Sequence, residues 1–198
     1  MENDRQKYFA VMDESISHKG GKATYVISAS IFREPKFRID ELFINFLVGA
    51  KIFKTNRFYA RKRFGRIKSA LLWNRDNFAF NICSADTSTD MNFESARQFC
   101  LAKVLVALNG LEVSRCIMDS RENPDANDSM APNREDLLTL KLLKEDFLVA
   151  SELVLVHLTD HQCPLIGTAD VVSWSARRFI IGEDDAYWRI ISNNSIIV

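Results

Sequence analysis

The sequence has 198 residues and a mass of 22.7 kDa, a length that favours one domain over two very small ones. It is 47% hydrophobic and has few glycines and prolines, and it contains no apolar run of about 18 residues, which argues against extended disorder and a membrane span. The formal net charge of zero would argue against a nucleic-acid partner if the charges were evenly mixed. We therefore expect a soluble single domain that covers residues 1–198.

The N-terminal region predicts an antiparallel hairpin. The apolar run 8–12 ends at Asp13, and the segment 23–32 forms a second strand after a polar stretch that contains Gly20 and Gly21. We expect a loop somewhat longer than the tightest hairpin connection. The first residues lack the basic and apolar segments of an export signal, so we expect a cytoplasmic protein.

A basic segment follows the hairpin. After Pro35 the apolar residues recur with helical period, and we interpret about 42–75 as a basic helical insertion. It holds nine basic residues and no acidic one, whereas the rest of the chain has 17 basic and 26 acidic residues, a net charge of −9. This asymmetry suits a polyanion such as DNA or RNA, although a solvated helix face explains it equally well. The candidate nucleic-acid contacts are Lys54, Arg57, Arg61, Lys62, Arg63 and Arg66.

Aromatic residues are interleaved with these basic ones. Phe53, Phe58, Tyr59 and Phe64 could stack on nucleic-acid bases. Such aromatics are more often anchors in a hydrophobic core. The whole chain contains 14 phenylalanines, a high number for 198 residues. Some of them are therefore candidates to cover an interface with a second copy or a protein partner.

The remaining chain alternates strands with helices. We expect strands at 78–83, 113–118 and 153–158, and helices at 93–108, 133–147 and from Pro164 onward. The expected apolar face of the first of these helices includes Phe99 and Cys100, and Asn133 is a candidate N-cap for the second. The fold class is therefore α/β: a mixed five-stranded sheet, with an antiparallel hairpin first and parallel strands later, flanked by helices.

The four cysteines fit a reducing compartment. They are Cys83, Cys100, Cys116 and Cys163. None forms a closely spaced pair of the kind that holds zinc, and three lie in apolar runs. We expect reduced thiols in the core.

Three aspartates stand where a metal site would need them. Asp13 closes the first strand and Asp119 the fourth, and sites in open sheets collect at strand ends, so the two converge if their strands are parallel neighbours. Asp170 lies at the edge of the apolar face of the last helix. Hard oxygen ligands of this kind favour Mg²⁺ or Mn²⁺. Taken singly, each has a structural explanation: a turn after a strand for Asp13 and Asp119, and an ion pair with Arg177 for Asp170.

Glu14 is a weaker candidate for the same site. It adjoins Asp13, and neighbours in a regular strand point to opposite faces, so both reach one metal only if the strand ends between them. No P-loop, dinucleotide-binding motif or nucleophile elbow occurs in the sequence. A hydrolase that uses a Ser-His-Asp triad is therefore a poor interpretation.

Three short motifs resemble those of a bacterial family. Tyr8 to Ser15 (YFAVMDES), Ile117 to Arg121 (IMDSR) and Pro164 to Trp174 (PLIGTADVVSW) are similar to the three blocks of the "domain of unknown function 3800" family, a branch of the ribonuclease-H-like superfamily. The resemblance implies that Asp13, Asp119 and Asp170 match the metal-binding carboxylates of that superfamily. Two departures occur: Ile16 replaces the usual glycine, and residues 58–62 lack a Glu-Lys pair that many members carry.

The function that follows is a metal-dependent nuclease. Asp13, Asp119 and Asp170, with Glu14 as a further candidate, would hold two Mg²⁺ or Mn²⁺ ions that hydrolyse a phosphodiester bond of DNA or RNA. A catalytically silent module of the same fold, which binds nucleic acid or a protein partner in a defence or toxin-like system, is the alternative. A metal-dependent phosphatase for a small substrate would leave the basic segment without a role.

Overall fold

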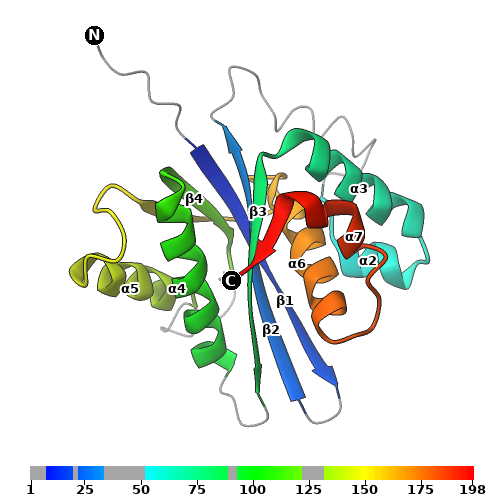
Figure 1. Ribbon diagram of the computed structural model, residues 1–198, viewed down its shortest axis with the longest axis horizontal. Helices are drawn as coiled ribbons and strands as arrows, with labels where there is room; N and C mark the ends of the chain where they lie inside the picture. Colours follow the sequence, from blue (N-terminus) through cyan, green and yellow to red (C-terminus); the bar gives the residue numbers. More distant parts are fainter. Residues whose placement is uncertain (1–7, 20–21, 34–51, 89–92, 122–131) are drawn as a thin grey trace.

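The computed structural model describes residues 8–19, 22–33, 52–88, 93–121 and 132–198. Its strands form one mixed sheet in the order β5-β4-β1-β2-β3-β6, with helices on both faces (Figure 1). Among these strands β2 alone runs against the others. The strands are β1 (Tyr8–Lys19), β2 (Lys22–Arg33), β3 (Phe80–Ser88), β4 (Val113–Asp119), β5 (Val154–Leu158) and β6 (Ser195–Ile197).

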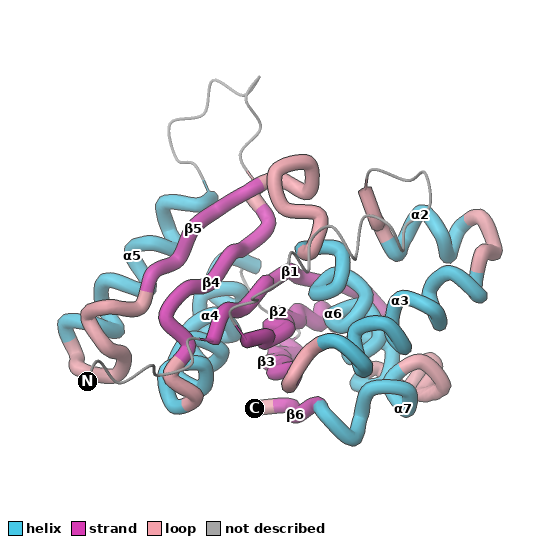
Figure 2. The backbone as a smooth tube through the Cα atoms, turned by 90° about the horizontal axis from the view of Figure 1, so that it is seen from above, coloured by secondary structure: helices cyan, strands magenta, loops and turns pink. Residues whose placement is uncertain are grey.

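The helices divide between the two faces of the sheet. One face carries α4 and α5, and the other carries α6 with α2, α3 and α7 outside it, as Figure 2 shows. The helices are α2 (Thr55–Ala60), α3 (Phe64–Asn77), α4 (Phe93–Gly110), α5 (Pro132–Glu145), α6 (Ile166–Ile180) and α7 (Trp188–Ile191), the last followed by a 3-10 turn at Ser192–Asn194. No helix in these described ranges is long and apolar enough to cross a membrane.

All five predicted strands are present, with two differences. The first strand does not end at Asp13 but continues to Lys19, which pairs with Lys22, so the hairpin connection has two residues and the prediction of a longer loop was wrong. The reason is that β2 continues to pair with β1 after β4 has ended. A sixth strand, Ser195–Ile197, lies parallel to β3 at the sheet edge, so the predicted count of five was one too low. The predicted helix between Pro35 and residue 51, including the start of the basic insertion, lies outside the described residues.

Strand alternation separates two cores. On β1, Val11 belongs to the core beneath α6, whereas Ala10 and Met12 belong to the core beneath α4. The four cysteines are buried and free, which confirms their expected place in the core. Helix α6 is fixed against the sheet by Ser28, whose hydroxyl donates to the carbonyl oxygen of Ala169 at 2.8 Å. This hydrogen bond fixes the position of α6 relative to the sheet at the residue before Asp170.

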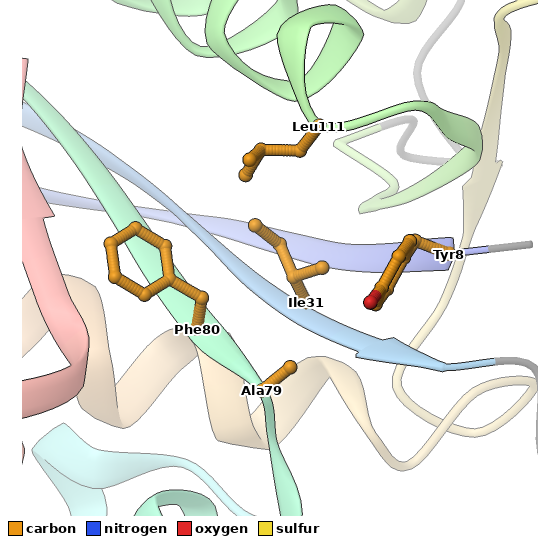
Figure 3. Close-up of a pocket in the computed structure, with 5 residues that line it drawn as sticks. All are labelled: Tyr8, Ile31, Ala79, Phe80 and Leu111. Carbon is orange, nitrogen blue, oxygen red and sulfur yellow. The ribbon is translucent and has the colours of Figure 1, made fainter. Parts of the chain in front are cut away.

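An apolar hollow of about 310 Å³ lies at the end of the sheet where β1, β3 and β4 begin (Figure 3). Its lining consists of Tyr8, Ile31, Ala79, Phe80 and Leu111. These residues offer no cluster of titratable groups. The chemistry-bearing side chains gather elsewhere, toward the ends of β4 and β5.

Candidate active site

Asp13 and Asp119 lie on adjacent parallel strands. The pairing of β1 with β4 runs from Tyr8 to Met12, and Asp13 and Asp119 are the next residues on the two strands. The condition for their convergence is therefore met. Of the two aspartates, only Asp119 lies at the end of its strand. Asp13 lies within β1, which continues to Lys19.

Asp170 reaches the same place from α6. Its side chain is buried, and its Oδ2 accepts hydrogen bonds from the backbone N–H of Thr55 at 2.6 Å and from the Thr55 hydroxyl at 2.9 Å. The alternative ion pair with Arg177 was wrong, because Arg177 Nε instead donates to Ser15 Oγ at 3.0 Å. Thr55 therefore ties the start of α2 (Thr55–Ala60), within the basic segment, to Asp170.

Lys54 lies among the carboxylates. Its Nζ is 2.9 Å from Oδ2 of Asp119 and 3.8 Å from Oδ2 of Asp13. The same atom is 2.9 Å from Oδ2 of Asp160. Sequence reasoning grouped Lys54 with the candidate nucleic-acid contacts, but here its ammonium pairs with carboxylates of the protein itself. We refer below to Asp13, Asp119, Asp160 and Asp170 as the aspartate cluster.

Asp160 is the member of the cluster that sequence reasoning missed. It follows the end of β5 by two residues, so the strand-end argument that selected Asp119 could have selected it as well. Its side chain is 13% exposed, and its Oδ1 is buried and accepts no hydrogen bond from the residues that the structure describes. A buried carboxylate oxygen without a donor is costly, which makes this atom a ready acceptor for a cation.

The cluster places four carboxyl groups near one ammonium, and burial shifts the pKa values of three of them. Burial, followed by repulsion from Asp170, raises the pKa of Asp13 well above its usual range. Burial also raises the pKa of Asp170 and Asp119, although the hydrogen bonds from Thr55 and Lys54 oppose the change. Burial alone would lower the pKa of Lys54, but attraction by Asp13 and the bonds to the other carboxylates outweigh it and raise that pKa. When all four aspartates are ionised, one ammonium leaves three negative charges uncompensated.

A divalent cation fits this donor set in chemistry and in charge. Carboxylate oxygens are the ligands that Mg²⁺ and Mn²⁺ prefer. Oδ1 of Asp160, which has no hydrogen-bond partner within the described ranges, is one such oxygen that a cation could contact. Across the part of the chain that the structure describes, no three acidic, histidine or cysteine side chains form a ready-made cage for a metal ion. The positive charge that these carboxylates contact is the Lys54 ammonium.

Glu14 belongs to a different group on the opposite face of the sheet. Its Oε2 accepts hydrogen bonds from Tyr25 and, at 2.8 Å, from Arg97 Nε, while Arg121 Nη1 lies 3.8 Å from Oε1. This is the alternation expected for neighbours within a continuous strand. The structure therefore brings Asp13, Asp119 and Asp170 together and directs Glu14 away from them.

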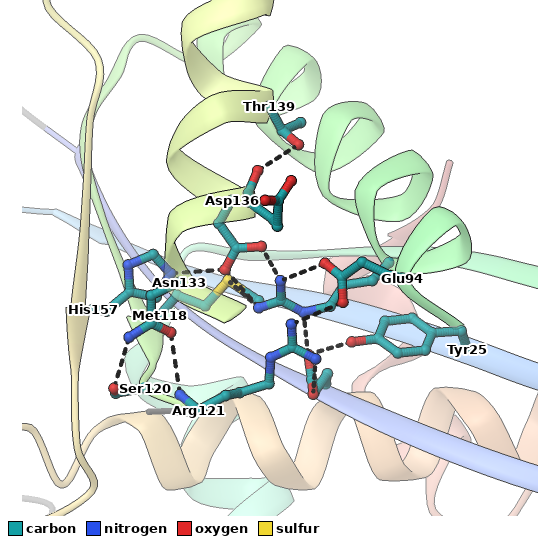
Figure 4. A network of polar contacts seen from close by, with 12 residues as sticks. Tyr25, Glu94, Met118, Ser120, Arg121, Asn133, Asp136, Thr139 and His157 are labelled. Carbon is teal, nitrogen blue, oxygen red and sulfur yellow. Dashed lines mark hydrogen bonds and ion pairs between the residues drawn. The ribbon is translucent and has the colours of Figure 1, made fainter. Parts of the chain in front are cut away.

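Arg97 is the centre of that second group, because it pairs with both Glu14 and Asp136. Figure 4 shows the network with Tyr25, Asp136 and His157 labelled. It is fully buried on α4 and forms a two-pronged ion pair with Asp136 of α5, including Nη2 to Oδ2 at 2.6 Å. His157 Nε2 is 2.8 Å from the same oxygen. Asn133, the predicted N-cap, instead accepts a hydrogen bond from the backbone N–H of Arg121. The group thus joins β4 and β5 to the two helices above them.

The remaining basic candidates lie on α2, on α3 and in the turn between them. Arg57, Arg61, Lys62, Arg63 and Arg66 are all exposed. The turn is closed by the backbone N–H of Arg63, which donates to the carbonyl of Phe58 at 2.8 Å. Phe53 and Phe58 stack on each other in or against the core, as the core-anchor interpretation predicted. We call the five exposed residues the basic surface.

Comparisons with known proteins give weak matches. No family model and no curated protein matches the sequence, so the family resemblance of the three motifs is not confirmed by this route. A chain in the PCNA–RNase HII complex of Archaeoglobus fulgidus is similar, with a TM-score of 0.48, 14% identity, and coverage of 93% of this chain and 86% of that one. NurA, alone and bound to dAMP and manganese, gives TM-scores of 0.26 and 0.27 at 10% identity, over 98% of this chain and 34% of NurA. TM-scores below 0.5 assign no function.

Proposed function

We propose that the protein is a metal-dependent nuclease that hydrolyses phosphodiester bonds of DNA or RNA at the aspartate cluster. The observation that carries this proposal is the convergence of three aspartates from β1, β4 and the end of β5 on one ammonium, with Asp170 of α6 close enough to raise the pKa of Asp13. Their negative charge exceeds what Lys54 offsets, as expected for a site that takes a divalent cation. The mixed sheet agrees with the ribonuclease-H-like fold that the three motifs imply.

Three aspartates of the cluster are the metal ligands in this proposal. Mg²⁺ or Mn²⁺, when bound, would activate a water molecule and stabilise the leaving oxygen. Asp13, Asp119 and Asp170 would hold these ions. Thr55 holds Asp170 in place through two hydrogen bonds, so it is a positioning residue. Burial of Asp13 and Asp170 limits competition from solvent for their oxygens.

The proposal predicts cleavage that depends on both metal and Asp170. We expect labelled DNA or RNA, single- or double-stranded, to be cut by the wild type with Mg²⁺ or Mn²⁺ and to stay intact with chelator. Asp170→Asn keeps the Thr55 hydrogen bonds through its amide oxygen but removes a ligand charge, so cutting should fall below detection. Cutting that persists in Asp170→Asn, or in chelator, would contradict the assignment.

The basic surface would hold the nucleic-acid backbone next to the cluster. Helix α2 begins at Thr55, which touches Asp170, so the exposed arginines that follow lie on the elements adjoining the site. We expect the triple variant Arg61→Glu, Arg63→Glu, Arg66→Glu to bind nucleic acid at least about tenfold more weakly and with a shallower salt dependence, because about three phosphate contacts are lost. Binding should be measured by fluorescence anisotropy at several salt concentrations.

A charge-matched triple variant provides the control. Lys103→Glu, Arg134→Glu and Lys141→Glu change the net charge by the same amount at exposed positions on α4 and α5, on the other face of the sheet. These changes should leave the salt dependence close to that of the wild type. Equal loss of binding in both triple variants would show that the basic surface responds only to overall charge.

A catalytically silent binding module is the second candidate function. The observation that favours it is the position of Lys54, which already supplies a cation to the cluster. Such a module would bind nucleic acid or a protein partner without cutting. It would become the better proposal if no substrate is cut and neither Mg²⁺ nor Mn²⁺ raises the melting temperature.

A further inference from the structure

We propose that Lys54 is the resident cation of the aspartate cluster and that a divalent metal ion binds there only by displacing the Lys54 ammonium from Asp119 and Asp160. This inference rests on the proposed function and concerns how the same site is controlled. It makes Lys54 a competitor of the metal rather than a contact for the nucleic acid alone.

The geometry places the ammonium where a metal would have to lie. Lys54 Nζ bridges Oδ2 of Asp119 and Oδ2 of Asp160 at 2.9 Å each, with Oδ2 of Asp13 at 3.8 Å. A divalent ion coordinated by these oxygens at about 2.0–2.2 Å would occupy the space between them that Nζ fills. The two cations are therefore mutually exclusive at this position.

The side chain can leave without disturbing the backbone. Phe53, the residue before Lys54, is buried in the core against Phe58, and Thr55, the residue after it, is held by Asp170. These neighbours fix the main chain on both sides. The Lys54 side chain is 30% exposed and has a flexible four-carbon stem, so it can swing toward solvent by rotation of its own bonds.

The competition has a measurable consequence for metal affinity. The apparent dissociation constant of a ligand rises in inverse proportion to the fraction of protein in the competent state. If Lys54 occupies the cluster in nearly all metal-free molecules, only a small fraction of the protein is free to bind a metal ion. Replacing Lys54 with a neutral residue makes nearly all of the protein free to bind, and it also removes the positive charge that offsets one of the four carboxylates. We therefore expect Mn²⁺ to bind at least about tenfold more tightly when Lys54 is replaced by a neutral residue.

The experiment measures Mn²⁺ binding by titration calorimetry in the absence of substrate. It compares the wild type with Lys54→Met, which keeps much of the length and removes the charge, and with Lys54→Arg, which keeps the charge. Lys68→Met is the matched control, because Lys68 is an exposed lysine of α3 and is not among the ammonium groups that pair with the cluster in the described residues. We expect tighter binding in Lys54→Met only.

The outcomes separate this inference from the proposed function. Equal or weaker Mn²⁺ binding in Lys54→Met than in the wild type overturns the displacement of Lys54 while leaving the metal site in place. Absence of Mn²⁺ binding in every variant removes the metal site itself, and the proposed nuclease with it. Tighter binding in Lys54→Met and Lys68→Met alike would point to bulk charge and would also overturn the inference.

A second measurement uses the unaltered protein, in case Lys54→Met does not fold. Acetylation of individual lysines is followed by mass spectrometry with and without saturating Mn²⁺. Lys54 should react several times faster with Mn²⁺ present, because its ammonium no longer pairs with Asp119 and Asp160, and Lys68 should react at the same rate in both conditions. An unchanged rate at Lys54 under saturating metal overturns the inference.

Discussion

Asp13→Asn is expected to reduce metal-dependent cleavage by about 10³-fold or more while leaving the protein folded. Asp13 follows the last paired residues of β1 and β4, its Oδ2 is 3.8 Å from Lys54 Nζ, and it is close enough to Asp170 for the two charges to interact. Loss of a charge that holds the metal ions removes several kcal/mol of transition-state stabilisation, which corresponds to a factor of this size. Cleavage under single-turnover conditions with Mg²⁺ measures the effect.

The same variant should melt at a higher temperature than the wild type in chelator. The pKa of Asp13 is raised by burial and then by repulsion from Asp170, which means that the folded state disfavours the ionised carboxylate. Replacing it with a neutral amide of similar shape removes this cost, and the amide oxygen can still accept the hydrogen bond from the backbone N–H of Glu14. Asp76→Asn, at an exposed position on α3, should change neither cleavage nor melting. Full cleavage by Asp13→Asn would exclude the proposed site.

In Asp13→Asn, the expected gain in stability and the expected loss of cleavage have the same cause. A site that gathers carboxylates for a metal is strained in the absence of that metal, and functional sites commonly trade stability for such charge arrangements. A variant that lost activity by unfolding would melt at a lower temperature instead. The melting measurement therefore separates a chemical role of Asp13 from a structural one.

The sequence predicted the three aspartates because each satisfies a local rule. Asp119 follows an apolar strand, and Asp170 falls at the edge of a helical stripe, both visible within a few residues. Lys54 satisfies no such rule, since its partners Asp119 and Asp160 lie 65 and 106 positions further along the chain. Its place within a run of basic residues suggested a surface contact. Pairings of this range become visible only when the sheet order is known.

The buried face of helix α4 also differs from the face that the sequence pattern predicted. Phe99 was expected to be buried with Cys100, but it is 50% exposed, and the buried face instead includes Arg97. Hydrophobic periodicity cannot identify a buried arginine, because the pattern counts it as polar. Its burial depends on Asp136 and Glu14, which arrive from another helix and from β1. The charged interior of this face was therefore not predicted.

Arg97→Met is expected to destabilise the protein by about 3–5 kcal/mol, the usual effect of breaking a buried ion pair. The variant leaves Asp136, which is fully buried, without its two-pronged partner, and it leaves Glu14 with Tyr25 and the more distant Arg121. Urea denaturation followed by circular dichroism measures the free energy of unfolding. Lys103→Met, at an exposed position on the same helix, should stay within about 0.5 kcal/mol of the wild type.

The cost of Arg97→Met should come mostly from the stranded carboxylate of Asp136 and less from the lost attraction. If so, the double variant Arg97→Met, Asp136→Leu recovers part of the stability that the single variant loses, because two apolar side chains of similar volume replace the pair. A double variant less stable than the single one would instead show that Asp136 is satisfied by His157, which lies 2.8 Å from its Oδ2. In that case the ion pair with Arg97 would itself supply the stability, and His157 would be the residue that shields Asp136 from the cost of burial.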